Sequence, residues 1–386
     1  MDFDVIIIGG GLVGASLAGA LANSGLKLAL LEAKAPPAVP ADGWDSRIYA
    51  IGPNEAAFLD QCGVWSRLDP ARIAPVAAME VYGDAGARLD FSAYQSGVRE
   101  LAYILESRLL QQALWQALSQ QENLTLVCPV QCAALAWRPE CAELRLGDGT
   151  LLRGKLAVGA DGGDSWVRAQ AGIAVASRGY GQMAVVANFA TQKPHRGIAR
   201  QWLRPDGALA YLPLPGNRVS IVWSAWDAQA QALLALDPQA LCEEVARAGH
   251  DDLGEMQLIT PPAAFPLKLQ RAERLIAPRC ALIGDAAHSM HPLAGQGVNL
   301  GFRDARELAQ VLQQRGACPD CGDSALLRRY ERARREDILA TQTVSDGLQR
   351  LFNNESPVLA RLRNAGLDLT NRMAPVKKLL VQHALG

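Results

Sequence analysis

The sequence predicts an α/β fold that combines a parallel sheet with a second, mostly antiparallel sheet and C-terminal helices. Residues 4–8 form a short apolar run rich in β-branched side chains, as expected for a buried parallel strand. A glycine-rich run at 9–14 follows, and residues 15–22 then have the spacing of a helix. Alternating apolar runs, such as 218–223 after the turn residues 215–217, predict the antiparallel part.

The glycine-rich turn predicts a binding site for a dinucleotide. Gly9 permits a tight turn, Gly11 lets the backbone approach a pyrophosphate, and Gly14 allows the helix to pack closely on the strand. The N-terminus of the helix then faces the phosphates with free N–H groups and a partial positive charge.

A second strand is predicted over residues 27–31, and it ends at Glu32, where a carboxylate can accept hydrogen bonds from ribose hydroxyls. Up to this point NAD and FAD fit equally well. The uncharged run 5–22 raises the alternative of a signal peptide or membrane helix. However, Asp2 and Asp4 stand where a signal peptide needs positive charge, and the glycines would break a spanning helix.

A late segment favours FAD. Residues 280–283 predict a strand that leads into Gly284 and Asp285, followed by a loop over 292–297 and then a helix. The Asp285 carboxylate can bind ribityl hydroxyls, and the helix N-terminus near 297–299 can stabilise negative charge on a reduced flavin. NAD has no ribityl chain, so FAD is the predicted cofactor.

The same late segment carries a resemblance to a known family. Residues 288–299 read His-Ser-Met-His-Pro-Leu-Ala-Gly-Gln-Gly-Val-Asn, and further matching stretches lie at 45–47, 106–114, 159–162 and 212–224. On these residues the chain resembles the group A flavoprotein monooxygenases, whose archetype is 4-hydroxybenzoate hydroxylase. Within that group it is most similar to the polyprenyl-phenol and polyprenyl-benzoquinol hydroxylases of ubiquinone biosynthesis.

The resemblance implies a fold of the 4-hydroxybenzoate hydroxylase type with three parts. A Rossmann-like FAD-binding domain is expected to comprise residues 1–70, 99–174 and 271–323. An inserted, mostly antiparallel substrate domain is expected at 71–98 and 175–270, and a C-terminal helical region at 324–386.

The resemblance also assigns residues to the cofactor. The expected FAD-binding residues are Gly9, Gly11, Leu12, Val13, Gly14, Glu32, Arg47, Arg108, Asp161, Gly284, Asp285, Pro292, Gly295, Gln296, Gly297, Val298 and Asn299. Asp161 belongs to a motif implicated in flavin and nicotinamide interaction, and Asp285 matches the ribityl-binding acid. From the pattern alone, Arg108 is equally well an ordinary surface arginine of a helix. His288 and His291 lie in the flavin motif, and no set of four ligands supports a metal site.

The function implied by the resemblance is hydroxylation of an aromatic ring. An FAD-dependent monooxygenase of this kind acts on a polyprenylated phenol or benzoquinol through a C4a-hydroperoxyflavin. O₂ is the co-substrate, and electrons come from NAD(P)H or a reductase, since the sequence has no second glycine-rich dinucleotide unit. Two alternatives stay open, namely the same chemistry on a small soluble phenol and a flavin-binding component of a biosynthetic complex with little turnover. The catalytic base and the ring position are not identified by the sequence.

Composition bounds the partners and the location. The 386 residues have a net charge of −1 and no basic stripe, so nothing favours nucleic acid as a partner. Eight cysteines without framework spacing, and no export signal, fit a cytoplasmic protein. The short amphipathic segment 374–381 leaves peripheral contact with the inner membrane open, and a homo-oligomer is equally open. The arginine-rich run 328–337 predicts a solvated helix face. The aromatic side chains expected by default in the core of the second sheet are Trp202, Tyr211, Trp223 and Trp226.

Overall fold

The computed structural model describes residues 1–36, 43–83, 86–292, 295–316, 318–354, 357–373, 376–378 and 380–381. Leu293 and Ala294 of the predicted flavin loop lie outside the described residues, as does part of the amphipathic segment 374–381.

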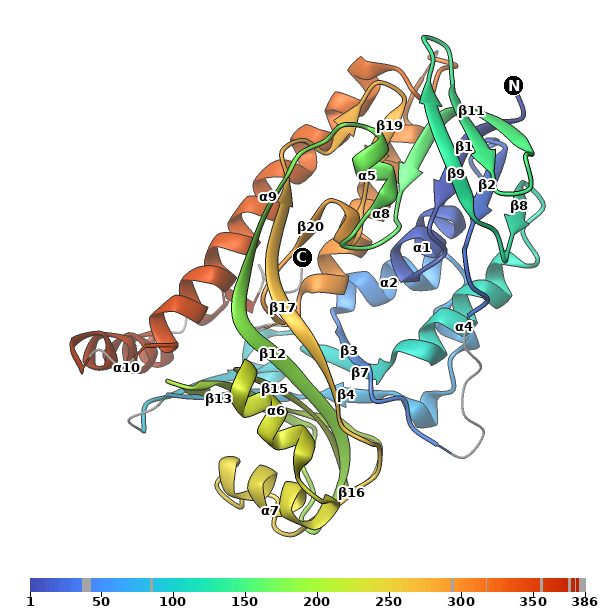
Figure 1. The fold of residues 1–386 in the computed structure, drawn as a ribbon. Helices are drawn as coiled ribbons and strands as arrows, with labels where there is room; N and C mark the ends of the chain where they lie inside the picture. The colour runs from blue at the N-terminus through green and yellow to red at the C-terminus, as the bar shows by residue number, and fades with distance from the viewer. Residues whose placement is uncertain are drawn as a thin grey trace.

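The first sheet contains the predicted parallel strands (Figure 1). Its order is β18 (Ile276–Ala277), β19 (Cys280–Leu282), β11 (Leu151–Gly159), β1 (Phe3–Ile8), β2 (Leu28–Leu31) and β8 (Leu124–Val127). The pairs β19–β11, β11–β1, β1–β2 and β2–β8 are all parallel. The antiparallel hairpin β9 (Cys132–Trp137) and β10 (Ala142–Leu146) extends β11. Every residue of β2 is buried, as expected for a strand covered on both faces.

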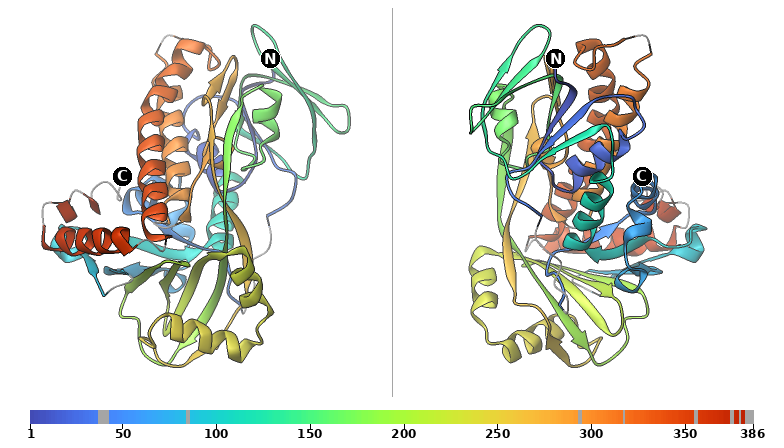
Figure 2. Two further views of the ribbon diagram at one scale, coloured as in Figure 1. Left: turned by 60° about the vertical axis from the view of Figure 1, so that its left-hand side comes forward. Right: turned by 90° about the vertical axis from the view of Figure 1, so that its right-hand side faces the viewer.

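Helices pack on this sheet because their apolar sides meet its buried strands. Against it lie α1 (Leu12–Ala20), α2 (Pro53–Gln61), α4 (Ser107–Leu118) and α8 (Gly297–Gln313), which share one core with the sheet. Figure 2 shows the long helix α9 (Ser324–Phe352) running beside α8, and α10 (Pro357–Arg372) follows it and packs on strand β6 (Arg88–Ser92). Within the described part of the chain, no helix is both long enough and apolar enough to span a bilayer.

The second sheet is mostly antiparallel and begins with a long two-stranded ribbon. Its order is β20 (His288–Ser289), β17 (Ala263–Ala272), β12 (Val175–Thr191), β15 (Arg218–Trp226), β14 (Gly207–Leu214), β13 (Ile198–Arg204), β5 (Ala78–Tyr82) and β6 (Arg88–Ser92). The short strand β16 (Met256–Leu258) pairs with β12, and only the β13–β5 pair is parallel among those described. In Figure 1 β12 and β17 run together from the first sheet down into the second. Sequential antiparallel strands are the arrangement that alternating runs predict.

One face of the second sheet is covered by α6 (Asp227–Ala235) and α7 (Pro238–Ala248). Trp202, Tyr211 and Trp223 are buried in this core, whereas Trp226 is 43% exposed. The first three aromatic residues therefore stabilise the sheet from the side away from the first sheet.

A third, three-stranded sheet has the order β3 (Ile48–Ile51), β7 (Ala102–Glu106) and β4 (Ala74–Val76). The sequence does not predict this sheet, because its short strands come from separate segments and no local pattern links them. Strand β4 lies in the segment predicted for the substrate domain but pairs with a strand predicted for the other domain. The predicted domain boundaries remain predictions.

Candidate functional site

The predicted cofactor motifs meet at one edge of the first sheet. Strands β19, β11, β1 and β2 are adjacent and parallel, so their carboxyl ends lie side by side. Gly9 follows β1 and Glu32 follows β2. Asp161 comes two residues after β11, and Gly284 comes two residues after β19. In open sheets of this kind, ligands bind outside the carboxyl ends of the strands.

The three glycines of the first motif have different surroundings. Gly9 has φ +108°, and an added Cβ would lie 2.3 Å from the carbonyl oxygen of Ala160. A Cβ on Gly14 would lie 2.0 Å from the carbonyl oxygen of Gly9, so helix α1 approaches β1 as closely as a glycine allows. A Cβ on Gly11 would meet nothing within 4 Å. The protein's own packing therefore requires Gly9 and Gly14, whereas the space beside Gly11 is of the kind a pyrophosphate would fill.

Glu32 is held against this turn by the backbone. Its Oε2 accepts a hydrogen bond from the Gly10 N–H at 2.6 Å, and its Oε1 accepts one from the Lys34 N–H at 3.1 Å. Trp115 of α4 closes the other side, since its Nε1–H donates to the Gly10 carbonyl at 2.9 Å. The carboxylate is thus oriented next to the glycine turn and keeps lone pairs for ribose hydroxyls.

The late motif packs directly on the first one. Gly284 has φ +59°, and an added Cβ would lie 3.2 Å from a methyl group of Val13. A Cβ on Gly301 of α8 would lie 2.6 Å from the same side chain. Val13 therefore fills the contact between α1 and α8, and residues far apart in the sequence form one continuous wall.

Asp285 is the acid that the structure leaves available. Its side chain is accessible to water, and no hydrogen bond from a described residue reaches its carboxylate. Enough protein nevertheless surrounds the carboxyl for desolvation to raise its pKa, against the opposing charges of His288 and Arg47. An accessible carboxylate that accepts no hydrogen bond from the described chain suits the hydroxyls of a ribityl chain.

Asp45 connects the two predicted arginines. Its Oδ1 accepts a hydrogen bond from the backbone N–H of Arg47, and its Oδ2 accepts one from the backbone N–H of Arg108, each at 3.1 Å. The Arg108 Nε lies 3.7 Å from Asp45 Oδ1. The Arg47 guanidinium lies over the rings of Tyr49 and Phe265, at 5.5 and 5.9 Å from their centroids. Arg47 thus contacts both strand β3, through Tyr49, and strand β17 of the second sheet, through Phe265.

Tyr49 lies near two of the predicted cofactor-binding residues, Arg47 and Asp285. Burial raises the pKa of Tyr49, with Arg47 opposing and Asp285 reinforcing that rise. Arg47, Tyr49 and Asp285 are therefore close enough to act on one another electrostatically, as expected for residues around one ligand.

Asp161 has a different position from the other predicted contacts. Its Oδ1 accepts the Ser165 hydroxyl at 2.5 Å and its Oδ2 accepts the Val167 N–H at 3.0 Å. Both oxygens therefore serve the start of α5 (Trp166–Gln170). Arg168 of the same helix donates to the Ala286 carbonyl at 2.8 Å and so connects the segment around Asp161 to the late motif. A contact of Asp161 with flavin or nicotinamide remains a prediction.

The loop before α8 is anchored by Asn299, which is 1% exposed. Its Nδ2 donates to the Ala50 carbonyl at 2.9 Å and to the Gly295 carbonyl at 3.3 Å. Its Oδ1 accepts the Gly52 N–H at 3.2 Å. Gly297 opens the helix, and an added Cβ there would meet nothing within 4 Å. The remaining predicted residues of this loop, Pro292, Gln296 and Val298, adjoin Gly297 and Asn299 in the chain. The free space beside Gly297 leaves room for a ligand at the start of α8.

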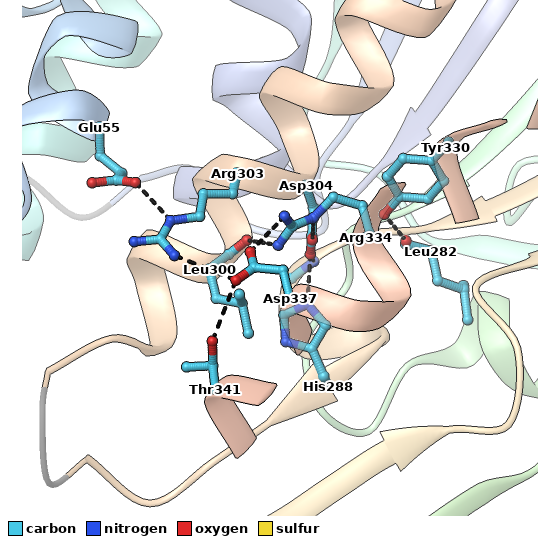
Figure 3. Close-up of polar contacts among 11 residues, drawn as sticks. Glu55, Leu282, His288, Leu300, Arg303, Asp304, Tyr330, Arg334, Asp337 and Thr341 are labelled. Carbon is cyan, nitrogen blue, oxygen red and sulfur yellow. Dashed lines mark hydrogen bonds and ion pairs between the residues drawn. The ribbon is translucent and has the colours of Figure 1, made fainter. Parts of the chain in front are cut away.

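A buried network of charges lies under the late motif (Figure 3). The Asp304 carboxylate lies 2.6 Å from His288 Nε2 and 2.7 Å from Arg334 Nε, and it accepts the Gly284 N–H at 2.9 Å. Arg334 also pairs with Asp337 at 2.7 Å. Beside this cluster, Arg303 pairs with Glu55 at 2.9 Å. The network holds the turn at Gly284 to helices α8 and α9.

The prediction of a solvated helix face over residues 328–337 is wrong at Arg334. This side chain is 6% exposed, because α9 packs on α8 and brings Arg334 to the buried Asp304. Sequence spacing within one helix does not reveal a partner on another helix.

The second sheet turns an uncharged face toward the Asp45 loop. On the face opposite α6 and α7, Arg218 at the start of β15 donates to the Pro215 carbonyl and lies over the Trp44 ring. Strand pairing places these uncharged side chains on the rest of that face: Ala184, Val186, Asn188, Ala199, Gln201, Leu203, Ala208, Ala210, Leu212, Ser220, Val222 and Ser224. We call this set the uncharged face. Asn188 Nδ2 donates to the Asp45 carbonyl at 2.8 Å, which fixes the direction of the face. Its central residues Ala210, Leu212 and Val222 are only half-buried, so the centre remains accessible.

Several site residues were not predicted from the sequence. Asp45 stands two residues before Arg47 inside a matching stretch, and its position could have identified it. Trp115 and Tyr49 carry no local signal, since only the folded chain brings them to Gly10 and Arg47.

Comparison with known proteins agrees with this geometry. A family model described as an FAD binding domain matches residues 2–345. A ubiquinone hydroxylase of Rhodospirillum rubrum is 39% identical over 99% of this chain and 89% of its own length. The 3-demethoxyubiquinol 3-hydroxylase of Escherichia coli is 36% identical over 99% of this chain and 98% of its own length.

A solved structure matches the fold. The crystal structure of a probable FAD-dependent monooxygenase from Pseudomonas aeruginosa superposes with a TM-score of 0.79 at 24% identity. The match covers 95% of this chain and 99% of that one. The predicted α/β fold, with its second sheet and C-terminal helices, is thereby confirmed.

Proposed function

Because this chain belongs to the family of FAD-dependent hydroxylases that contains these ubiquinone-biosynthesis enzymes, we propose that it hydroxylates the ring of a polyprenylated phenol or benzoquinol. The uncharged face is the observation that supports this substrate class. A phenolic acid would need a cationic partner beside its ring, and the centre of the face carries no charge; Arg218, at the start of β15, and Arg47, over Phe265, lie at its edges. Its accessible centre, formed by Ala210, Leu212 and Val222, is apolar.

The residues fit FAD as the resident cofactor. Gly11 and Glu32 suit the pyrophosphate and the adenine ribose, Asp285 suits the ribityl chain, and Gly297 at the start of α8 suits the ring. Reduced FAD supplies the activation of O₂ that ring hydroxylation requires. The chain's part is to hold the substrate ring on the uncharged face and to keep water away from it.

We propose that electrons come from NAD(P)H or a separate reductase, which binds the protein only transiently. Since a polyprenylated substrate resides in lipid, we place the reaction at the inner-membrane surface, reached from the cytoplasm by peripheral association or within a biosynthetic complex. Exposed Leu339, Val344 and Leu348 on α9 offer apolar surface for such contact.

The test uses the purified holoprotein with NADPH or NADH and a series of phenols that carry zero to three isoprene units. Donor oxidation and hydroxylated product, identified by mass spectrometry, are expected to rise steeply with prenyl length, since each buried CH₂ contributes about 0.8 kcal/mol. With 4-hydroxybenzoate or salicylate both signals should be weak. Tight coupling to a small phenolic acid, with no gain from a prenyl tail, would contradict the proposal and favour a soluble phenol.

A matched pair of variants locates the substrate. Val222→Glu places a charge at the centre of the uncharged face, and it should abolish prenyl-phenol turnover while FAD stays bound. Asn217→Glu makes the same charge change at an exposed turn residue before the same strand, and it should leave turnover unchanged. Equal turnover in the two variants would exclude this face as the substrate site.

A further inference from the structure

A cavity lies between helix α9 and one end of the β12–β17 ribbon, away from the cofactor motifs. The helix contacts the ribbon end at two points. The backbone N–H of Leu275 donates to Glu331 Oε1 at 2.8 Å, and Gln342 Nε2 donates to the Gln270 carbonyl at 2.8 Å. Between these two contacts a cavity of about 550 Å³ opens to solvent. Its volume is in the range of sites that bind ligands.

Small and apolar side chains form the walls of this cavity. Ala174, just before β12, and Ala176 within it line the ribbon side and leave the space unfilled. Leu275 and Ile338 line the cavity from the core and are 5% and 2% exposed. Leu339 also lines it but is 47% exposed. The cavity therefore has an apolar interior with a leucine at its opening.

Arginine side chains surround the same cavity. Arg271 and Arg274 line it from the ribbon, and Arg335 lines it from α9. All three are exposed, and none has an ion pair or a side-chain hydrogen bond with a described residue. Of the two acids that line the cavity, Glu331 accepts the backbone hydrogen bond given above, and Glu273 is exposed. The guanidinium groups are therefore available to an anion from outside the protein.

Further arginines continue this surface along α9. Arg328, Arg332 and Arg335 are spaced four and three residues apart, so they share one face of the helix with Leu339. The run for which the sequence predicts a solvated helix face thus borders an apolar cavity. Five arginines and three glutamates (Glu273, Glu331 and Glu336) leave this surface a net charge of +2, although the whole chain has a net charge of −1.

This combination suits a lipid with an anionic headgroup. Guanidinium groups bind phosphate oxygens with two parallel hydrogen bonds, and arginines near an anionic bilayer are attracted to it. A leucine at the same surface can enter the boundary between headgroups and acyl chains. A soluble anion would leave Leu339 uncovered, and a neutral lipid would leave the arginines without a partner.

We propose that this surface, formed by Arg271, Arg274, Arg328, Arg332, Arg335 and Leu339, docks the protein on a bilayer that contains anionic phospholipid. We call it the arginine groove. The guanidinium groups bind phosphodiester groups, and Leu339 lies among the first acyl carbons. This inference rests on the proposed function and deepens it, because it states how the protein reaches the membrane in which a polyprenylated substrate resides.

The experiment measures flotation of the holoprotein with lipid vesicles. One set is pure phosphatidylcholine, and in the other about one-third of the lipid is phosphatidylglycerol. The unmodified protein should partition onto the anionic vesicles at least about tenfold more strongly, and added NaCl should reduce this preference because salt screens the charges.

Variants locate the contact. Each arginine near an anionic surface changes partitioning roughly fivefold, so the triple variant Arg271→Gln, Arg274→Gln and Arg335→Gln should bind anionic vesicles on the order of 100-fold more weakly. Leu339→Ser should weaken binding about tenfold through loss of apolar contact.

A control variant makes the same change of charge elsewhere. It replaces three exposed arginines of other elements with glutamine: Arg99, Arg145 and Arg196. This variant should retain most of the binding, since its charges lie outside the arginine groove. Flavin content and melting temperature of each variant show that the fold is intact.

Three results would overturn the inference. They are equal binding of the unmodified protein to the two kinds of vesicle, unchanged binding in the groove variant, and an equal loss in the control variant. Flotation requires no turnover, so it is independent of the proposed function. Turnover of a short prenyl phenol without vesicles should be unchanged in the groove variant. Failure of the unmodified protein in that assay would count against the proposed function and would leave the flotation result valid.

Discussion

Asp304 Oδ2 lies 2.6 Å from His288 Nε2, and both side chains are almost completely buried. The same oxygen accepts the Gly284 N–H, and the other carboxylate oxygen pairs with Arg334. One acid of α8 thus supports the turn that presents Asp285 to the cofactor site. Desolvation opposes ionisation of Asp304, but His288 and Arg334 outweigh it and lower the pKa of its carboxyl.

Asp304→Asn should therefore destabilise the protein strongly. The change removes the Asp304 charge from buried Arg334, which keeps Asp337 and the Leu300 carbonyl, and loss of one partner of a buried pair costs about 3–5 kcal/mol. Urea unfolding of the variant and of the unmodified protein measures this difference. Asp337→Asn is the matched control, because Asp337 contacts the same arginine but is 22% exposed, and its effect should be smaller. Equal effects of the two changes would show that burial of Asp304 is not what stabilises the turn.

The dependence of folding stability on pH in the acidic range also involves Asp304. Because its pKa is lower in the folded than in the unfolded protein, its stabilising contribution is present above the unfolded pKa and is lost as pH falls toward the folded value. The loss of stability with falling pH in this acidic range should be shallower in Asp304→Asn. An identical pH profile for the variant would contradict the lowered pKa.

Asp285→Ala should weaken FAD binding with little effect on the apoprotein. Its carboxylate receives no hydrogen bond from the described chain, so removal leaves no partner unsatisfied. Loss of charge-assisted bonds to ribityl hydroxyls, worth roughly 1.5–3 kcal/mol, lowers FAD affinity on the order of 10- to 100-fold. Titration of apoprotein with FAD measures it. In Asp161→Ala, by contrast, apoprotein stability should fall by about 1 kcal/mol, because Asp161 accepts hydrogen bonds from the Ser165 hydroxyl and the Val167 N–H at the start of α5. A normal FAD affinity in Asp285→Ala would refute the assignment.

Gly11→Ala and Gly14→Ala should separate cofactor binding from folding. A methyl group on Gly11 meets no protein atom within 4 Å, so the apoprotein should fold normally while FAD affinity falls. A methyl group on Gly14 would lie 2.0 Å from the Gly9 carbonyl oxygen, so this variant should lose stability or fail to fold. Apoprotein melting temperature and FAD titration together provide the two readouts. FAD affinity that survives in folded Gly11→Ala would show that the pyrophosphate does not approach this residue.

His291 should give stability a second dependence on pH. Its pKa falls from 6.5 to about 4 on folding, so the unfolded chain binds a proton that the folded chain does not. Stability should be fully present above about 6.5 and decline as pH falls toward 4, by about 3 kcal/mol at most. Urea unfolding between pH 4 and 7 measures it, and His291→Phe should remove this component. A His291→Phe profile that still matches the unmodified protein would assign the effect to another group.

The sequence by itself determined the fold class, the FAD cofactor and the family, because these depend on short local patterns. The tight turn at Gly9 and the close packing at Gly14 each require a glycine within one short stretch of chain. The spacing of the glycines therefore predicts both. The acid after β19 is likewise placed by the end of a strand.

Only the tertiary structure decided how those motifs are joined and what lies around them. The contacts of Asp161 with the start of α5, the pairing of Arg334 with Asp304 and the contact of Gln182 with His291 are all seen only in the folded chain. The uncharged face likewise exists only once strand pairing brings four strands into register. Such contacts follow from which side chains meet when separate helices and strands pack together, and no spacing along one segment encodes that meeting.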